Sequence, residues 1–224
     1  ILHSNVGLMH GSMAIFNAFC DRVPMLIFGA TGPLDAKKRR PWIDWIHTSQ
    51  DQASIIRNFI KWDNQPGSTE ASIEAIYRAA NIAQPFTKGP VYVCFDTAIQ
   101  EEKINNKTII PEFTKYEQIG NQFPSEKDIE EARKILLKAK NPVIFFGRVS
   151  RSKKDWLNRV LLIEKLGATA FTDRKTGASF PTNHPMHKFP PLQFLSPKEV
   201  EFIKKSDVIL SLDWVDLAGT KKIK

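Results

Sequence analysis

Two short apolar runs decide the fold: Pro24-Met25-Leu26-Ile27-Phe28 and Val91-Tyr92-Val93-Cys94-Phe95. Neither run alternates between polar and apolar residues, and each is bounded by glycine or proline. This pattern is typical of a parallel strand that is covered on both faces. The turn Gly29-Ala30-Thr31-Gly32-Pro33 follows the first run, and Lys88-Gly89-Pro90 leads into the second. The sequence therefore predicts two buried strands in one parallel sheet.

Helical patterns surround these strands. Small and apolar residues predict a buried helix over 11–21, and a second helix is expected over about 50–59. A third helix is predicted over 68–83, with Ser68 as its N-cap. The apolar face of this third helix is expected to consist of Ile73, Ile76, Tyr77, Ala80 and Ile82.

The second half of the chain repeats the alternation of helix and strand. Helices are predicted over 125–140, 155–166 and 198–204, and strands over 142–146, 168–172 and 208–212. The alternation predicts an α/β fold in which helices flank parallel sheets in two units. We expect these units at residues 1–98 and 125–224, the second being Rossmann-like. Residues 99–124 have few periodic apolar positions, which is typical of a linker.

The composition restricts the class of protein. The 224 residues carry a formal net charge of +8, but only Lys37-Lys38-Arg39-Arg40 forms a compact basic cluster. A solvated basic surface is therefore expected, with no nucleic-acid partner. The longest apolar run is too short to cross a bilayer, and no secretory signal opens the chain. The two cysteines have no metal-ligand spacing, so a cytoplasmic protein without a metal site in this chain is predicted.

Several motifs occur in an order that resembles one enzyme family. The chain contains, in sequence, Leu2-His3-Ser4-Asn5-Val6-Gly7, Asn17-Ala18, Pro24-Met25-Leu26-Ile27, Lys88-Gly89-Pro90-Val91-Tyr92-Val93 and Asp207-Val208-Ile209-Leu210. Together they resemble the thiamine-diphosphate-dependent enzymes of the acetolactate synthase and benzoylformate decarboxylase type. The resemblance covers nearly the whole chain. It implies that residues 1–98 are the C-terminal part of a pyrimidine-binding domain and that 125–224 are most of the central domain.

The resemblance also implies what the intact protein does. We expect a 2-oxo-acid decarboxylase or carboligase that uses thiamine diphosphate and Mg²⁺ and forms a homodimer or homotetramer. The family's activating glutamate lies upstream of Ile1, and its Gly-Asp-Gly metal motif lies downstream of Lys224. The chain is therefore expected to be an internal piece that is inactive alone. The turn at Gly147-Arg148 lacks a second glycine at the usual spacing, so FAD is not implied.

Three candidate site residues lie near the start of the chain. His3 aligns with a histidine that benzoylformate decarboxylases use for proton transfer, a role that suits a group titrating near neutral pH. The alternative is a structural histidine at a strand end. Gly7 and His10 fall on the loop and helix start that approach the cofactor's pyrimidine, and a glycine there allows a close backbone approach. Most relatives carry asparagine or a small polar residue at the position of His10, so an ordinary helix histidine remains the alternative.

The other candidates follow the first strand. The acetolactate synthase pattern Phe-Gln-Glu-x-Asp, followed by Arg-x-x-x-Lys, is matched by Asp51, Arg57 and Lys61. His47 and Thr48 replace the phenylalanine and glutamine that face the substrate in those enzymes. His47, Thr48 and Lys61 are therefore predicted to line the substrate. The two replacements argue against acetolactate synthesis and favour another acyl acceptor or a plain decarboxylation. The alternative for the basic pair is a solvated helix face.

Two rival functions remain open at this level. The second unit could be a non-catalytic nucleotide-binding module, which predicts nucleotide binding by residues 125–224 alone. The tryptophans Trp42, Trp45 and Trp62 could stack on nucleic-acid bases beside the basic cluster, which predicts steeply salt-dependent affinity. Tryptophans at such spacing are more often core or subunit-interface residues, and that is the expectation here.

Overall fold

The computed structural model describes residues 1–104, 106, 108–112 and 123–220. The chain divides into two compact units, Ile1–Gln122 and Phe123–Lys224, and each is described by itself. Much of the predicted linker, namely 105, 107 and 113–122, lies outside the described residues. The assignment of 99–124 as a linker stays a prediction.

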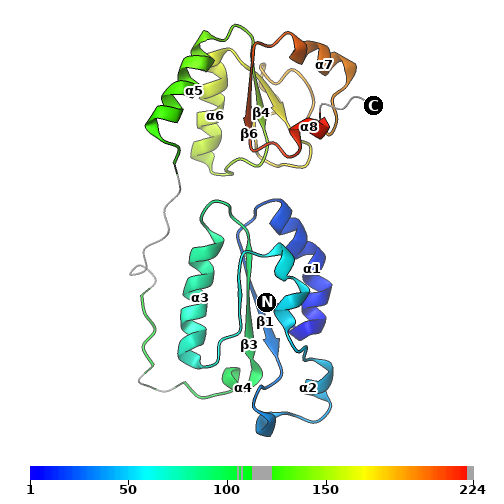
Figure 1. Ribbon diagram of the computed structural model, residues 1–224, viewed down its shortest axis with the longest axis vertical. Helices are drawn as coiled ribbons and strands as arrows, with labels where there is room; N and C mark the ends of the chain where they lie inside the picture. The colour runs from blue at the N-terminus through cyan, green and yellow to red at the C-terminus, as the bar shows by residue number, and fades with distance from the viewer. Residues whose placement is uncertain (105, 107, 113–122, 221–224) are drawn as a thin grey trace. The chain divides into compact units, whose positions relative to one another are not determined.

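The first unit is a parallel sheet with helices on both faces (Figure 1). Its helices and strands are α1 (Ser4–Cys20), β1 (Met25–Thr31), α2 (Ile43–Ile46), β2 (Asp63–Asn64), α3 (Thr69–Ala83), β3 (Pro90–Asp96) and α4 (Thr97–Gln100). The strand order is β1-β3-β2. β1 and β3 pair along their full length, from Met25 opposite Pro90 to Thr31 opposite Asp96, so both strands end at the same edge.

β3 is the centre of this unit because it is buried on both faces. Tyr92 and Cys94 face a core that includes Leu8 and Ile15 of α1. Val91 and Val93 face the opposite way, against the alanines of α3. Side chains alternate between the faces of a strand, so an unbroken apolar run is what two covering helices require. The prediction of two parallel strands is confirmed, and β3 is buried as expected, whereas β1 is buried only at alternate positions from Ile27 to Thr31.

Three details of the helices differ from the expectation. α1 begins at Ser4 rather than Gly11, and it is not buried throughout, because Val6, Met9, Met13, Phe16 and Phe19 are exposed. The buried face of α3 is the stripe of Ala75, Ala79 and Ala83, not the larger residues, since small side chains let the helix approach the sheet closely. Residues 50–59 form two short 3₁₀ turns, Gln52–Ile55 and Arg57–Phe59, instead of a helix. In the first turn Ser54 bonds back to the carbonyl of Asp51, which competes with α-helical bonding.

The second unit repeats the α/β arrangement. It contains α5 (Glu126–Lys138), β4 (Pro142–Phe146), α6 (Lys153–Leu166), β5 (Thr169–Thr172), α7 (Pro197–Lys204), β6 (Val208–Leu212) and α8 (Leu217–Thr220). All three strands are parallel, in the order β5-β4-β6. Every one of its predicted strands and helices is confirmed to within two residues. Ser125 and Ser152 cap α5 and α6 by accepting bonds from backbone N–H groups.

Aromatic rings fill one side of the second sheet. The Phe171 ring lies stacked 5.0 Å from the ring of Phe145 and 5.2 Å from that of Phe189. Ile144 and Phe146 point to the other face, toward Ile163 of α6. The predicted α/β class therefore holds for both units. None of the described helices combines the length and the apolar character that crossing a bilayer requires.

Candidate functional site

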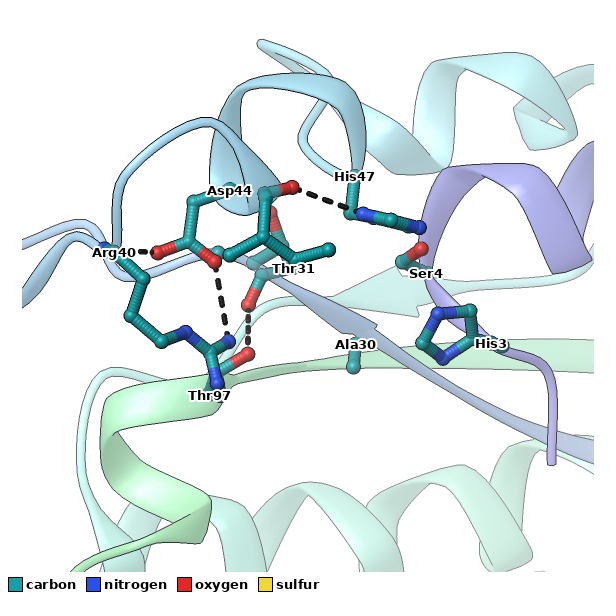
Figure 2. A pocket seen from close by; sticks show the side chains of 10 residues that line it. His3, Ser4, Ala30, Thr31, Arg40, Asp44, His47 and Thr97 are labelled. Atoms are coloured by element: carbon teal, nitrogen blue, oxygen red, sulfur yellow. Dashed lines mark hydrogen bonds and ion pairs between the residues drawn. The ribbon is translucent and has the colours of Figure 1, made fainter.

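A small cavity lies at the carboxyl edge of the first sheet (Figure 2). Its volume is about 180 Å³, and the polar side chains that line it are His3, Ser4, Thr31, Arg40, Asp44, His47 and Thr97. Ligand pockets usually reach about 300–1,000 Å³, so this cavity suits a small molecule or one end of a larger one. Ligands of parallel α/β sheets bind outside the carboxyl ends of the strands, which is where this cavity lies.

The segment before α1 brings His3 to this edge. The Leu2 amide donates to the Phe28 carbonyl of β1 at 2.8 Å, so His3 follows directly after a contact with the strand. Gly7 and Gly11 make room for Leu2, since a Cβ on Gly11 would lie 2.9 Å from its Cδ1 atom. Glycine at both positions thus allows the chain to fold back against its own helix.

Ser4, the first residue of α1, has a φ of +43°. Residues other than glycine seldom occupy this left-handed region. Such backbone conformations concentrate at functional sites, where the surrounding structure holds them. The one at Ser4 lies between His3 and the helix, on the wall of the cavity.

The turn after α2 brings His47 to the same cavity. The Gly32 amide donates to Thr48 Oγ1 at 3.1 Å, and Asn5 Nδ2 donates to the Ile46 carbonyl at 3.3 Å. The residues on both sides of His47 are therefore tied, one to the end of β1 and the other to the start of α1. A Cβ on Gly32 would lie 3.0 Å from Asp44 Cβ and closer still to Thr48 Oγ1, so only glycine allows this approach.

The result is a histidine pair. The ring centroids of His3 and His47 lie 5.1 Å apart, with the rings edge to face at 64°. His3 is exposed at the rim and His47 is half-buried. Figure 2 shows the His47 ring extending from its turn toward Ser4 and His3. Two of the predicted site residues, 44 positions apart in sequence, therefore meet, while their predicted roles in catalysis and substrate contact stay predictions.

An ion pair forms another wall of the cavity. Asp44 accepts from the Arg40 amide at 2.6 Å and from its guanidinium at 3.1 Å. The bond from the Arg40 amide is the main reason that the pKa of Asp44 lies below its ordinary value, and the guanidinium and His47 act in the same direction. Arg40 also donates to Glu101 at 3.3 Å. Asp44 is therefore a fixed negative charge next to the histidine pair.

A polar group that the sequence did not reveal supports the floor of the cavity. Gln52 is 1% exposed, and its Nε2 donates to the Ala30 carbonyl at 3.0 Å and to the Tyr92 hydroxyl at 2.7 Å. Burial raises the pKa of Tyr92 above its ordinary value, so the hydroxyl keeps its proton. Only the apposition of β1, β3 and the 3₁₀ turn creates this contact, and a lone glutamine gave no signal for it.

The remaining candidates lie elsewhere. Lys61 is at the opposite edge of the sheet, where its amide donates to the Pro90 carbonyl and its Nζ donates to the carbonyls of Ile82 and Pro85. Desolvation lowers the pKa of this lysine. It does not line the cavity, and its contact with substrate stays a prediction. Gly7 and His10 both lie inside α1, so the expectation that Gly7 lies on a loop is wrong. Their contact with a cofactor also stays a prediction.

The compact basic cluster is largely occupied by internal bonds. Lys38 pairs with Glu102 at 2.8 Å, and Arg39 donates to the carbonyls of Pro33 and Leu34. Arg40 is paired as described, and the absence of a nucleic-acid partner stays a prediction. Among the described residues, no three histidine, cysteine, aspartate or glutamate side chains gather in a way that could hold a metal ion.

Comparison with solved structures identifies the fold. One similar structure is the thiamine diphosphate-dependent 4-hydroxybenzoylformate decarboxylase of Rhodococcus jostii RHA1, with a TM-score of 0.76 and 22% identity over 94% of this chain. Another is the benzoylformate decarboxylase of Polynucleobacter necessarius, with a TM-score of 0.77 and 19% identity, again over 94% of this chain. This chain has the fold of thiamine-diphosphate-dependent decarboxylases.

The match extends over only part of those enzymes. The chain covers 39% of the Rhodococcus enzyme and 38% of the Polynucleobacter enzyme. No protein-family model matches the chain. At these identities the likeness concerns the fold, and the activity of the whole protein is a matter for proposal.

Proposed function

We propose that this chain is part of a thiamine-diphosphate-dependent enzyme that decarboxylates a 2-oxo acid, with benzoylformate-type acids as the preferred substrate class. One observation carries the proposal: His3 and His47 face each other at 5.1 Å in a cavity at the carboxyl edge of a sheet with this fold. Histidine is the side chain best suited to proton transfer at neutral pH. Acyl transfer to a second carbonyl compound, as in a carboligase, is the related outcome for the same site.

The residues of the cavity fit the reacting end of the cofactor and its substrate. Bound thiamine diphosphate would supply a carbanion that attacks the 2-oxo group and then takes up the electrons released with CO₂. Around that reaction the cavity offers two imidazoles and the hydroxyls of Ser4, Thr31 and Thr97. The described residues contain no candidate cluster for Mg²⁺. We assign this chain to the substrate side of the site and propose that residues outside it hold the diphosphate and Mg²⁺.

The individual groups have separate tasks in this proposal. His3, exposed at the rim, exchanges a proton with the substrate. The start of the 17-residue helix α1, at Ser4, has a partial positive charge that favours the substrate carboxylate. The hydroxyl of Thr31 orients the substrate by donating a hydrogen bond. The Thr97 hydroxyl donates its own proton to the Thr31 carbonyl at 2.7 Å and so holds this wall of the cavity in place.

Self-association is part of the proposal. Val6, Met9, Met13 and Phe16 form an exposed apolar face on α1, with exposed fractions from 41% to 63%. Contiguous exposed apolar surface marks interaction sites. We propose that this face contacts a second copy of the protein in a homodimer or homotetramer, and that the chain alone is inactive.

Two exposed tryptophans also suit a subunit interface. Trp42 and Trp45 are 70% and 83% exposed, so a core position is wrong for both. Trp62, in contrast, packs partly buried against the core of the first unit. Large exposed aromatic side chains are enriched at protein interfaces, and we propose that Trp42 and Trp45 contribute to contacts between subunits.

The test uses the intact protein that contains this chain. Titration with thiamine diphosphate in the presence of Mg²⁺ should show saturable binding by calorimetry. Benzoylformate and pyruvate are then assayed separately. Each should be decarboxylated only when thiamine diphosphate and Mg²⁺ are both present, and benzoylformate should react faster. A His3→Ala variant should retain cofactor binding and lose most of the rate, since acid–base groups contribute about 10²–10⁴-fold. Absence of thiamine diphosphate binding by the unsubstituted protein would rule the proposal out.

A further inference from the structure

The hydrogen bond of His47 defines which ring nitrogen carries its proton. His47 Nδ1 lies 2.9 Å from the backbone carbonyl oxygen of Ile43, one helical turn earlier. A carbonyl oxygen can only accept, so Nδ1 must be the donor in this bond. A neutral imidazole has one N–H group and one lone pair. The Nε2 atom of His47 is therefore the basic position of the ring.

The surroundings of His47 hold this basic nitrogen toward the cavity. Ile46 and Thr48, its neighbours in sequence, are bonded to Asn5 and Gly32 respectively. The bond to Ile43 fixes the remaining rotation of the ring. In Figure 2 the end of the ring opposite that bond is directed toward Ser4, with His3 nearby. The orientation of Nε2 thus depends on three separate hydrogen bonds.

An acidic, a basic and an aromatic side chain surround His47. Asp44 lies on the same turn, and a protonated His47 interacts favourably with its carboxylate. Arg40 faces the same carboxylate and balances part of its charge. His3 faces the His47 ring edge to face. Within the described part of the chain, the His3 imidazole has no hydrogen bond that defines its tautomer, so His47 is the more strictly oriented member of the pair.

We infer that His47 is a second catalytic residue of this site, one that transfers a proton through Nε2. The inference rests on the proposed function. Decarboxylation of a 2-oxo acid, R–CO–COO⁻ + H⁺ → R–CHO + CO₂, consumes one proton. The protonated ring delivers it from Nε2: the N–H bond breaks, its electron pair stays on Nε2, and the proton forms a new bond on the substrate side. The ring returns to the neutral form with Nδ1–H still bonded to Ile43, and solvent supplies the next proton to Nε2.

One test needs neither cofactor nor substrate. Nitrogen NMR of histidine side chains distinguishes a protonated ring nitrogen from a bare one, and the His47→Asn spectrum identifies which signals belong to His47. We expect the neutral His47 ring to carry its proton on Nδ1. A neutral ring protonated on Nε2 would contradict the inference, because no lone pair would then face the cavity.

A second test measures turnover in the intact protein with thiamine diphosphate and Mg²⁺. The amide of an asparagine reaches the position of imidazole Nδ1 and can still donate to the Ile43 carbonyl, but it places no titratable group at Nε2. His47→Asn should therefore keep the cofactor affinity while kcat falls about 10²- to 10⁴-fold. Added imidazole should restore part of the rate, which a merely structural role would not allow.

The matched control is His184→Asn. His184 belongs to the second unit and does not line the cavity, and its Nδ1 accepts from the Met186 amide, a bond that the asparagine Oδ1 can keep. This variant should leave both kcat and the response to imidazole unchanged. If His47→Asn retains the full kcat, or loses it together with cofactor affinity and without rescue, the inference is wrong while the proposed function stands. If the unsubstituted protein binds no thiamine diphosphate, the proposed function fails, and this inference fails with it.

Discussion

Replacing Gly32 with alanine tests how the cavity is built. Gly32 joins the end of β1 to the turn that bears His47, and its amide donates to Thr48 Oγ1 at 3.1 Å. An added Cβ would overlap Thr48 Oγ1 and lie 3.0 Å from Asp44 Cβ and 3.2 Å from Asp44 Cγ. The turn must therefore move outward, which breaks the bond to Thr48 and separates His47 from His3.

The expected magnitude follows from these contacts. Overpacking of this kind costs about 1–3 kcal/mol, and losing the hydrogen bond adds about 1 kcal/mol. The first unit should therefore lose about 3 kcal/mol, which is a factor of roughly 150 in its opening equilibrium. Because Thr48 supplies the nearest atom, Gly32→Ala should be less harmful when Thr48 is also alanine, and a double-mutant cycle measures that coupling.

Hydrogen exchange of peptides from β1 and β3 reports the stability of this unit by itself. Gly32→Ala should accelerate exchange there by the factor given above. Gly67→Ala is the control, because a Cβ at Gly67 meets no atom within 4 Å, and it should leave exchange unchanged or slow it slightly. Equal exchange in the two variants would refute the steric argument for Gly32.

Three further predictions concern packing and charge. Ala79 lies on the buried face of α3 and is 0% exposed, so Ala79→Leu should destabilise the protein by about 1–3 kcal/mol. Ile76 of the same helix is 38% exposed, so Ile76→Ala should cost less. Urea unfolding followed by circular dichroism measures both changes. Phe171→Ala removes a ring stacked between two others and should cost about 3–5 kcal/mol in the same assay, so a change below that of Ile76→Ala would contradict the packing described. The bidentate bond from Arg57 holds the pKa of Asp51 below its ordinary value, so the pair stabilises the fold above about pH 4 and this contribution is lost as the pH falls through the lowered pKa. Asp51→Asn, which leaves the bonds of Arg57 to Asp63 in place, should therefore lower the urea midpoint at pH 7 and approach the unsubstituted protein in acid, and a difference independent of pH would show that another interaction was lost.

Local chemistry in the sequence was enough to predict every described strand except the two-residue β2, and the starts of α3, α5, α6 and α7. The run from Val91 to Phe95 is apolar because both faces of β3 are covered, and its short length and the preceding glycine and proline favour a strand over a buried helix. Ser68 and Ser125 are N-caps that define where α3 and α5 begin, because each side chain accepts a bond from a backbone N–H group of the first turn. These signals act within a few residues, so they can be read without knowing the partners.

Contacts between distant segments decided the rest. The face that α3 buries depends on how closely β3 allows it to approach, which selects alanines over larger apolar residues. Lys61 and His47 are only 14 positions apart but lie at opposite edges of the sheet. Lys61 bonds to Pro90 at the start of β3, whereas His47 lines the cavity with Thr97, which follows the end of β3.

The histidine pair also combines features that the sequence predicts with features that only tertiary contacts define. The sequence alone indicated His3 and His47 as candidate residues and predicted the parallel sheet. That the rings meet, and that His47 presents Nε2 rather than Nδ1, depends on the bonds that Asn5 and Gly32 donate and on the bond that the Ile43 carbonyl accepts. The type of a residue defines which chemical groups it carries. Its partner and its orientation depend on backbone groups from distant segments, which contact it only in the folded chain.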